Sequence, residues 1–172
     1  MAQSPDTLEP ALPDDVLARA DRVLELAKAS RMSLASAESC TGGLLAALLT
    51  DVPGHSHLFE RGFVTYSEDA KVEMLGVDRG RLDRFGAVSR EIARDMAQGA
   101  LNHSHADVAV SITGYAGPSG DGGEEGLVHF ACAHRGGVVA DREEHFGEIG
   151  RAEIRKAALE AALEMMEEAL NE

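Results

Sequence analysis

The sequence predicts an α/β protein: a three-layer α/β/α sandwich whose mixed, largely parallel sheet ends in a late antiparallel hairpin. Strand-like and helical segments alternate along the chain, the arrangement that produces parallel strands joined by helices. The segment "ADVAVSITG" is nearly all apolar, which indicates a strand buried on both faces. Two further strands, "LVHFACAH" and "VVADREEHF", meet near Gly136 and Gly137 and indicate a tight hairpin.

Length and composition favour one domain. Residues 1–13 carry three prolines and no apolar period, so we expect a loose N-terminal leader followed by a single domain over residues 14–172. There is no apolar run long enough to span a membrane and no secretory signal. We therefore expect no membrane association and a cytoplasmic protein.

The charge of the chain restricts its partners. It has 30 acidic and 16 basic side chains, for a formal net charge of −14. Such a field repels polyanions, so nucleic acid is not an expected partner. A small anionic ligand is compatible, because a few backbone amides and one arginine can hold a phosphate. The two cysteines, Cys40 and Cys132, do not suggest a disulfide framework, and we expect both to be reduced.

The first half of the chain predicts a helix followed by two strand–helix units. The helix begins near Asp14, with Asp14 and Asp15 suited to cap it. "MSLASAE" is a small-residue strand, and "GGLLAALLTD" is a helix that stops at "DVPG". "RGFVTY" is a second strand, and "SEDAKVEMLG" is a helix with a serine cap, an acidic first turn and a glycine end.

The second half predicts two more helices around the buried strand and the hairpin. One helix runs from Ser89, as its cap, to about His103, with apolar residues on one face. The other is a long helix from Arg151 to Leu170 with an apolar stripe. This stripe favours a homodimer.

Three loops follow predicted strands, the place where ligands collect in open α/β sheets. In the first, "ESCTGG", the glycines and the following helix can hold a phosphate or a developing oxyanion. Ser39 lies where the strand passes into the helix, a position that exposes a nucleophile to amide donors. The loop does not match GxSxG, and its spacing alone favours a helix-capping serine.

The second loop, "TYSEDAK", offers a base for that serine. Lys71 can accept a proton if burial lowers its pKa enough to supply a neutral amine. Tyr66 can pass a proton or a hydrogen bond between Lys71 and Ser39. A Ser/Tyr/Lys set is coherent for acyl transfer, although a lysine on a helix is more commonly a solvated charge.

The third loop, "SITGYAGPSGDGG", permits close backbone approach to a phosphate or a ribose. It is neither a Walker A loop nor a GxGxxG fingerprint. Thr113 can add a hydroxyl to the site. A flexible surface loop is the alternative interpretation.

Histidines and cysteine give weaker candidates. His55 with His57, and the segment "HSHAD", lack further ligands at zinc spacing, so we expect solvated loops and no metal site. Cys40, at a helix N-terminus, can be a nucleophile in its own right. It ranks behind Ser39, because a lone intracellular cysteine is more commonly a small buried thiol.

Together, "AESCTGGLLAALLTDVPGHSHLFERGFVTYSEDAK", "GAVS" and "VSITGYAGPSGDGG" closely resemble the CinA C-terminal-domain family, which includes stand-alone nicotinamide-nucleotide amidases of the PncC type. The similarity runs from about Leu12 to the C-terminus. It implies an α/β/α fold, a homodimer, and metal- and cofactor-independent hydrolysis of nicotinamide mononucleotide to nicotinate mononucleotide and ammonia, a step of pyridine-nucleotide salvage.

The resemblance also implies site residues. The family's serine nucleophile falls on Ser39, its tyrosine on Tyr66 and its lysine on Lys71. Its nucleotide-facing loops fall on residues 41–43 and 113–118. With two residues added from the position of their side chains, Glu38 to orient the turn or a substrate hydroxyl and Arg151, the residues expected to bind the substrate are Glu38, Thr41, Gly42, Gly43, Thr113, Gly114, Ala116, Gly117, Pro118 and Arg151.

Three departures from the family pattern leave alternatives open. Glu68 adds an acid beside Tyr66 and Lys71, Tyr115 replaces an aliphatic residue of GIAGP, and "EIGR" keeps Arg151 but loses the acid of the family's "GDR". Arg151 can clamp a phosphate or form a structural salt bridge. The alternatives to the amidase are a non-catalytic nucleotide-binding or regulatory module on the same fold, and a thiol hydrolase that uses the cysteine after the serine.

Overall fold

A computed structural model describes residues 12–120, 122–137 and 139–171. In this part of the chain five strands form one sheet in the order β2-β1-β3-β4-β5. The strands are β1 Leu34–Glu38, β2 Phe59–Val64, β3 Val108–Gly114, β4 Leu127–His134 and β5 Val139–His145. β1 pairs in parallel with β2 and β3, whereas β4 is antiparallel to β3 and β5. The predicted mixed sheet and its late hairpin are confirmed.

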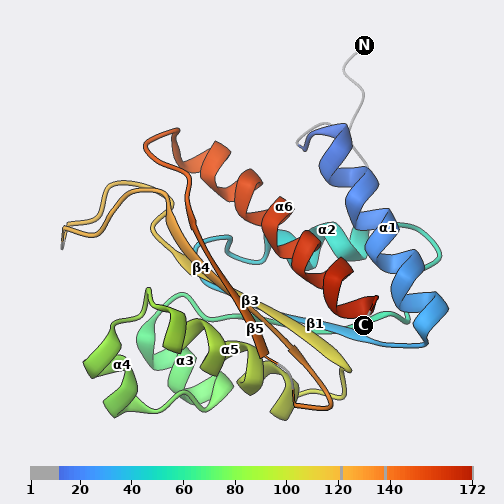
Figure 1. Ribbon diagram of the computed structural model, residues 1–172, viewed down its shortest axis with the longest axis horizontal. Coiled ribbons are helices and arrows are strands. Elements are labelled where there is room, and N and C mark those ends of the chain that lie inside the picture. Colours follow the sequence, from blue (N-terminus) through green and yellow to red (C-terminus); the bar gives the residue numbers. More distant parts are fainter. Residues whose placement is uncertain (1–11, 121, 138, 172) are drawn as a thin grey trace.

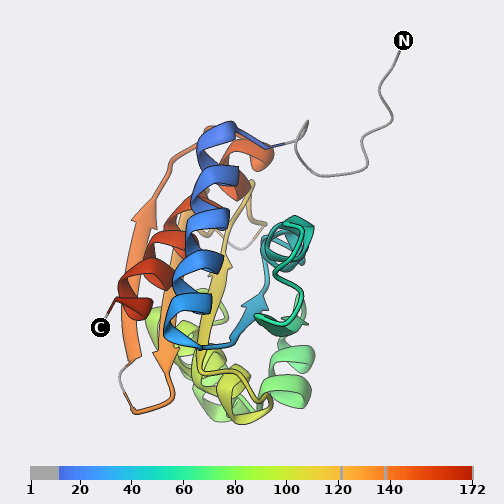
Figure 2. The same cartoon turned by 90° about the vertical axis from the view of Figure 1, so that its right-hand side faces the viewer.

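Helices cover both faces of the sheet. They are α1 Asp14–Ser30, α2 Leu44–Asp51, α3 Glu68–Leu75, α4 Arg79–Phe85, α5 Arg90–Asn102 and α6 Arg151–Leu170. Figure 1 shows α1, α2 and α6 on one side of the strands and α3, α4 and α5 on the other, and Figure 2 shows α1 and α6 beside the strands after a quarter turn. The three-layer prediction is therefore confirmed. α4 is not among the predicted elements, because a seven-residue helix with one buried leucine, Leu82, leaves no apolar period.

The two faces of the sheet carry side chains of different size. Toward α1, α2 and α6 the strands present large apolar residues, among them Leu34, Val110, Ile112 and Phe130. Toward α3, α4 and α5 they present mostly alanines, among them Ala35, Ala109 and Ala131. Small side chains on a sheet let the covering helices approach its backbone closely. α3, which carries Lys71, belongs to this tightly packed layer.

Helix caps follow the predicted chemistry at α3 and α5 but not at α1. Ser67 and Ser89 each accept the backbone N–H three residues on, at 3.1 and 3.3 Å. The N-cap of α1 is Pro13, which makes no side-chain cap bond. The predicted capping by Asp14 and Asp15 is wrong, because both lie inside the first turn, where their charge meets the positive end of the helix dipole instead.

The two ends of the domain pack together. The leader predicted over residues 1–13 falls mostly on residues 1–11, outside the described residues, whereas Leu12 is buried in the core that α1 and α6 share. The apolar stripe of α6 packs against α1, β3 and β4 within the same chain. The stripe therefore does not supply the dimer surface that the sequence suggested.

Among the described residues, every helix is too short or too polar to cross a bilayer.

Candidate active site

A cavity of about 290 Å³ opens at the carboxyl ends of β1, β2 and β3, the edge at which ligands bind in open α/β sheets. All three predicted loops reach it. Its lining residues are Ser39, Cys40, Tyr66, Lys71, Ala87, Val88, Thr113, Gly114, Tyr115, Ala116, Gly117, Pro118, Ser119 and Arg151. Loops far apart in the sequence thus form one site.

A lysine and a serine are in direct contact in this cavity. The Nζ atom of Lys71 lies 3.1 Å from Oγ of Ser39 and 2.8 Å from the carbonyl oxygen of Thr65. Only 1% of the Lys71 surface is exposed. Burial lowers the pKa of Lys71 below its ordinary 10.5 because desolvation penalises the charged amine, and this effect outweighs the opposing influence of Cys40 and Glu68. The interpretation of Lys71 as a solvated charge is wrong.

The helix-capping interpretation of Ser39 is also wrong. α2 begins at Leu44 with Gly43 as its N-cap, and no cap side chain closes the helix. Ser39 lies one turn earlier, directly after β1, where its N–H donates to the carbonyl of Ile112 on β3 (3.0 Å). The main chain is thereby held to the sheet while the hydroxyl faces Lys71.

Glu38 anchors the start of α2 instead. The side chain is fully buried. Its carboxylate accepts the hydroxyls of Ser36 (3.2 Å) and Thr41 (2.7 Å) and the N–H groups of Gly43 (3.1 Å), Leu45 (3.0 Å) and Ala46 (2.9 Å). A carboxylate is well placed at the positive end of a helix dipole. Glu38 therefore orients the turn, one of the two roles expected for it, and the Thr41 hydroxyl is occupied by Glu38.

The amides of the turn divide into used and free donors. Gly42 N–H donates to the Ser39 carbonyl (3.0 Å), and Gly43 N–H donates to Glu38. Both glycines have positive φ, +61° and +95°, which other residues adopt only with strain. Gly42 and Gly43 thus shape the turn and, contrary to prediction, offer no N–H to a ligand. The described hydrogen bonds join the N–H groups of Cys40 and Thr41 to no other residue, although the Cys40 N–H interacts with its own thiol.

Cys40 is a poor nucleophile. It packs into the core under the turn, and burial raises the pKa of its thiol from 9.0 to about 11. The thiolate is the reactive form, so near neutral pH the side chain is protonated and inert. Cys40 and Cys132 are both buried, and neither forms a disulfide within the described residues.

Tyr66 lies at the mouth of the cavity. Its side chain lines the opening while 71% of the residue is exposed. None of the described hydrogen bonds joins Tyr66 to the serine or the lysine. The predicted relay role does not match this geometry, because Lys71 reaches Ser39 directly.

The glycine-rich loop forms the opposite wall of the cavity. The Thr113 hydroxyl is already used, since it donates to the carbonyl of Ala87 (2.8 Å). A Cβ at Gly114 would lie 2.7 Å from the Leu127 carbonyl oxygen, and one at Gly117 would lie 2.9 Å from Nη2 of Arg151. Glycine thus lets the Arg151 guanidinium lie across the loop. The described contacts include no hydrogen bond or ion pair of Arg151, so the salt-bridge alternative is not observed.

The remaining candidates do not form a second centre. His55 pairs with Glu25 at 3.2 Å, and no group of three metal-ligating side chains occurs in the described ranges. Glu68 lies near Arg79, with 3.7 Å between the charged atoms, and is exposed on α3. The positive charge of Arg79 therefore partly offsets the effect of the Glu68 carboxylate on Lys71.

Sequence reasoning missed Ala87, Val88 and Ser119, which line the cavity, and it also missed Arg155, which contacts the turn of Ser39. Nη2 of Arg155 donates to the Thr41 carbonyl at 2.8 Å, from α6 into the turn that carries Ser39. The available signal was the spacing of "RAEIR", which places Arg155 four residues after Arg151 and on the same helix face.

Fold and site together define a class of protein: a three-layer α/β/α domain with a buried serine–lysine pair at the carboxyl edge of its sheet. The family model described as CinA C-terminal domain matches residues 17–170. The chain belongs to the CinA C-terminal domain family.

Relatives of two lengths match the chain. Nicotinamide-nucleotide amidohydrolase PncC of Escherichia coli strain K12 is 42% identical over 154 residues, which cover 88% of this chain and 93% of that protein. A CinA-like protein of Chlorobium limicola is 50% identical over 137 residues, or 77% of this chain. The chain spans only 32% of the length of this second relative.

Solved structures confirm the fold. The competence/damage inducible protein CihA from Agrobacterium tumefaciens superposes with a TM-score of 0.88 at 47% identity, covering 94% of this chain and 98% of that one. A CinA superfamily protein from Escherichia coli superposes with a TM-score of 0.84 at 33% identity, covering 90% and 91%.

Proposed function

We propose that this chain is an amidohydrolase that converts nicotinamide mononucleotide to nicotinate mononucleotide and ammonia in pyridine-nucleotide salvage. Two relatives named nicotinamide-nucleotide amidohydrolase PncC, 42% and 44% identical, support this substrate class, since the chain covers 93% and 87% of their lengths. The observation that carries the proposal is the 3.1 Å contact between Lys71 Nζ and Ser39 Oγ inside the cavity.

Acylation uses this pair. Neutral Lys71 takes the proton of the Ser39 hydroxyl as Oγ attacks the carboxamide carbon. The carbonyl electrons move onto the amide oxygen, and the N–H groups of Cys40 and Thr41, which donate to no other residue among the described hydrogen bonds, donate to that oxyanion. The C–N bond then breaks as Lys71 returns its proton to the leaving nitrogen. Ammonia departs, and nicotinate mononucleotide remains as an ester of Ser39.

Deacylation repeats the cycle with water. Lys71 takes a proton from the water as its oxygen attacks the ester carbonyl. The C–O bond to Ser39 breaks, and the proton passes from Lys71 to Oγ. The carboxylic acid product ionises, and the enzyme returns to its starting state.

The phosphate of the substrate is assigned to Arg151. Its guanidinium lies beside Gly117 on the cavity wall, with no described anion to neutralise it. Arginine suits phosphate because its planar donors can bind two oxygens at once. Tyr66, exposed at the mouth, is placed to contact the bound nucleotide.

The decisive test is ammonia release from nicotinamide mononucleotide. We expect Ser39→Ala and Lys71→Ala each to lower kcat by roughly 10³-fold or more, because nucleophile and base act as a unit. Cys40→Ala is the matched control and should keep most of the wild-type rate. Full activity of Ser39→Ala or of Lys71→Ala would overturn the mechanism. Binding of the nucleotide by calorimetry without turnover in the wild type would instead identify a regulatory module.

A further inference from the structure

Arg155 is a half-buried cation that has no anionic partner among the residues that the structure describes. Its Nη2 donates to the Thr41 carbonyl at 2.8 Å. Its Nε atom is buried and has no hydrogen-bond partner in the described part of the chain. The ion pairs described for this protein do not include Arg155, although the chain has 30 acidic side chains. A guanidinium that is removed from solvent is usually paired with a carboxylate. The Arg155 guanidinium instead donates to the carbonyl of the Thr41–Gly42 peptide.

That peptide group in turn holds the Ser39–Cys40 peptide, two peptide bonds earlier in the chain. The Thr41–Gly42 peptide is held on one side by Arg155 and on the other by the Gly42 N–H, which donates to the Ser39 carbonyl at 3.0 Å. Peptide bonds here are trans, so C=O and N–H point in opposite directions. Fixing the Ser39 carbonyl therefore also fixes the Cys40 N–H, which points away from the Gly42 bond.

We propose that Arg155 is a positioning residue, which holds the Thr41 peptide and thereby orients the Cys40 N–H toward the oxygen of the attacked amide. This inference rests on the proposed function. The Glu38 carboxylate accepts the Gly43 N–H of the same turn. The turn is therefore held by hydrogen bonds to a carboxylate and to a guanidinium. Gly42 has no Cβ to resist rotation, and without Arg155 the Thr41–Gly42 peptide keeps only the hydrogen bond from the Gly42 N–H to the Ser39 carbonyl.

The test compares Arg155→Met and Arg155→Lys with Lys156→Met, a matched change at the next residue of α6, whose ammonium pairs with Glu153 (3.0 Å) away from the turn. In Arg155→Met we expect kcat to fall about 10- to 100-fold, as when an oxyanion donor is misplaced. KM should stay within about twofold, because Arg155 is not among the residues that line the cavity. Arg155→Lys should recover part of kcat by donating one hydrogen bond to Thr41. Lys156→Met should match the wild type.

A second measurement separates this inference from the proposed function. The rate at which a fluorophosphonate probe labels Ser39 depends on the oxyanion donors but not on the nucleotide. We expect Arg155→Met to be labelled more slowly than Lys156→Met. If the wild type releases no ammonia from the nucleotide, the proposed function fails, while the labelling rates still test Arg155. The positioning role is overturned if Arg155→Met and Lys156→Met show equal labelling rates and equal kcat. It is also overturned if the wild type is not labelled, or if neither Arg155→Met nor Arg155→Lys folds.

Discussion

At the scale of single residues, burial of one amine makes the chemistry possible. Lys71 comes from an exposed first turn of α3, yet its Nζ ends in a cavity wall beside Ser39. Desolvation lowers its pKa, and no acid is placed close enough to reverse the effect. A lysine in this state can accept a proton, which a solvated lysine near neutral pH does not do.

The pH dependence of activity follows from that pKa. Because only neutral Lys71 is a base, we expect kcat/KM to rise with pH through the lowered pKa of Lys71. The negative charge of Glu68 raises that pKa, so Glu68→Gln should move the rise to lower pH. The measurement is the pH profile of ammonia release, with the exposed Glu73→Gln on the same helix as control. A shift toward higher pH in Glu68→Gln would contradict this assignment.

At the scale of helices and strands, close packing between α3 and α5 positions the lysine. A Cβ at Gly99 would lie 2.2 Å from the Leu75 carbonyl oxygen. We expect Gly99→Ala to lower the free energy of unfolding by about 1–3 kcal/mol through overpacking, and to lower kcat because α3 carries Lys71. Urea denaturation and ammonia release measure the two effects. Gly120→Ala is the control, since a Cβ there meets no atom within 4 Å; equal losses in both variants would exclude this mechanism.

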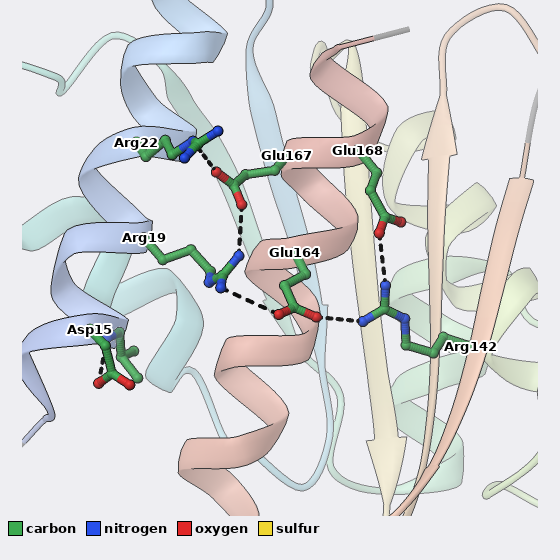
Figure 3. A network of polar contacts seen from close by, with 8 residues as sticks. Asp15, Arg19, Arg22, Arg142, Glu164, Glu167 and Glu168 are labelled. Atoms are coloured by element: carbon green, nitrogen blue, oxygen red, sulfur yellow. Dashed lines mark hydrogen bonds and ion pairs between the residues drawn. The ribbon is translucent and has the colours of Figure 1, made fainter.

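Charged side chains join α1, α6 and β5 on the other side of the sheet (Figure 3). Glu167 on α6 pairs with Arg19 at 2.8 Å and with Arg22 at 2.6 Å, and its side chain is 12% exposed. Glu168, 66% exposed, pairs with Arg142 at 3.0 Å. Solvent screening should therefore weaken the ion pair of Glu168 more than the ion pairs of Glu167.

These two glutamates form a matched pair for mutation. We expect Glu167→Gln to lower the free energy of unfolding by about 1 kcal/mol, because two guanidiniums lose a shared partner that is largely shielded from water. Glu168→Gln should have an effect near zero. Urea denaturation of both variants gives the comparison, and a larger loss in Glu168→Gln would show that α1 does not depend on this network.

At the scale of the whole molecule, one sheet joins two cores. β3 contributes Val108, Val110 and Ile112 to the core under α1 and α6, and Ala109 to the core under α5. If β3 unfolds, both hydrophobic cores lose the strand residues against which their helices pack. The site spans both layers, since Ser39 precedes α2 on one face and Lys71 belongs to α3 on the other.

We therefore expect a single cooperative unfolding transition. Leu159→Ala in one core and Met96→Ala in the other should each lower its free energy by about 2–5 kcal/mol. Calorimetry and far-ultraviolet circular dichroism should report the same midpoint for each variant. Two separate transitions, or a variant that shifts only one of them, would show that the cores unfold independently.

Local chemistry explains which features were predictable. Ser67 and Ser89 mark helix starts because a serine side chain satisfies an N–H only three residues away. The nearly apolar run of β3 and the glycines between β4 and β5 are local patterns, and they place these strands along the chain. The three loops of the site were recognisable because each directly follows a strand.

The sequence by itself therefore determined the α/β class, the order of its elements and the loops that carry Ser39 and Lys71. Only the tertiary structure decided what their side chains do. It brought Lys71 against Ser39 across 32 residues, gave the role of helix anchor to Glu38 and left Tyr66 exposed. It also brought Arg155 to Thr41 across 114 residues. Such contacts depend on how distant elements pack, and no local pattern of residues encodes that packing.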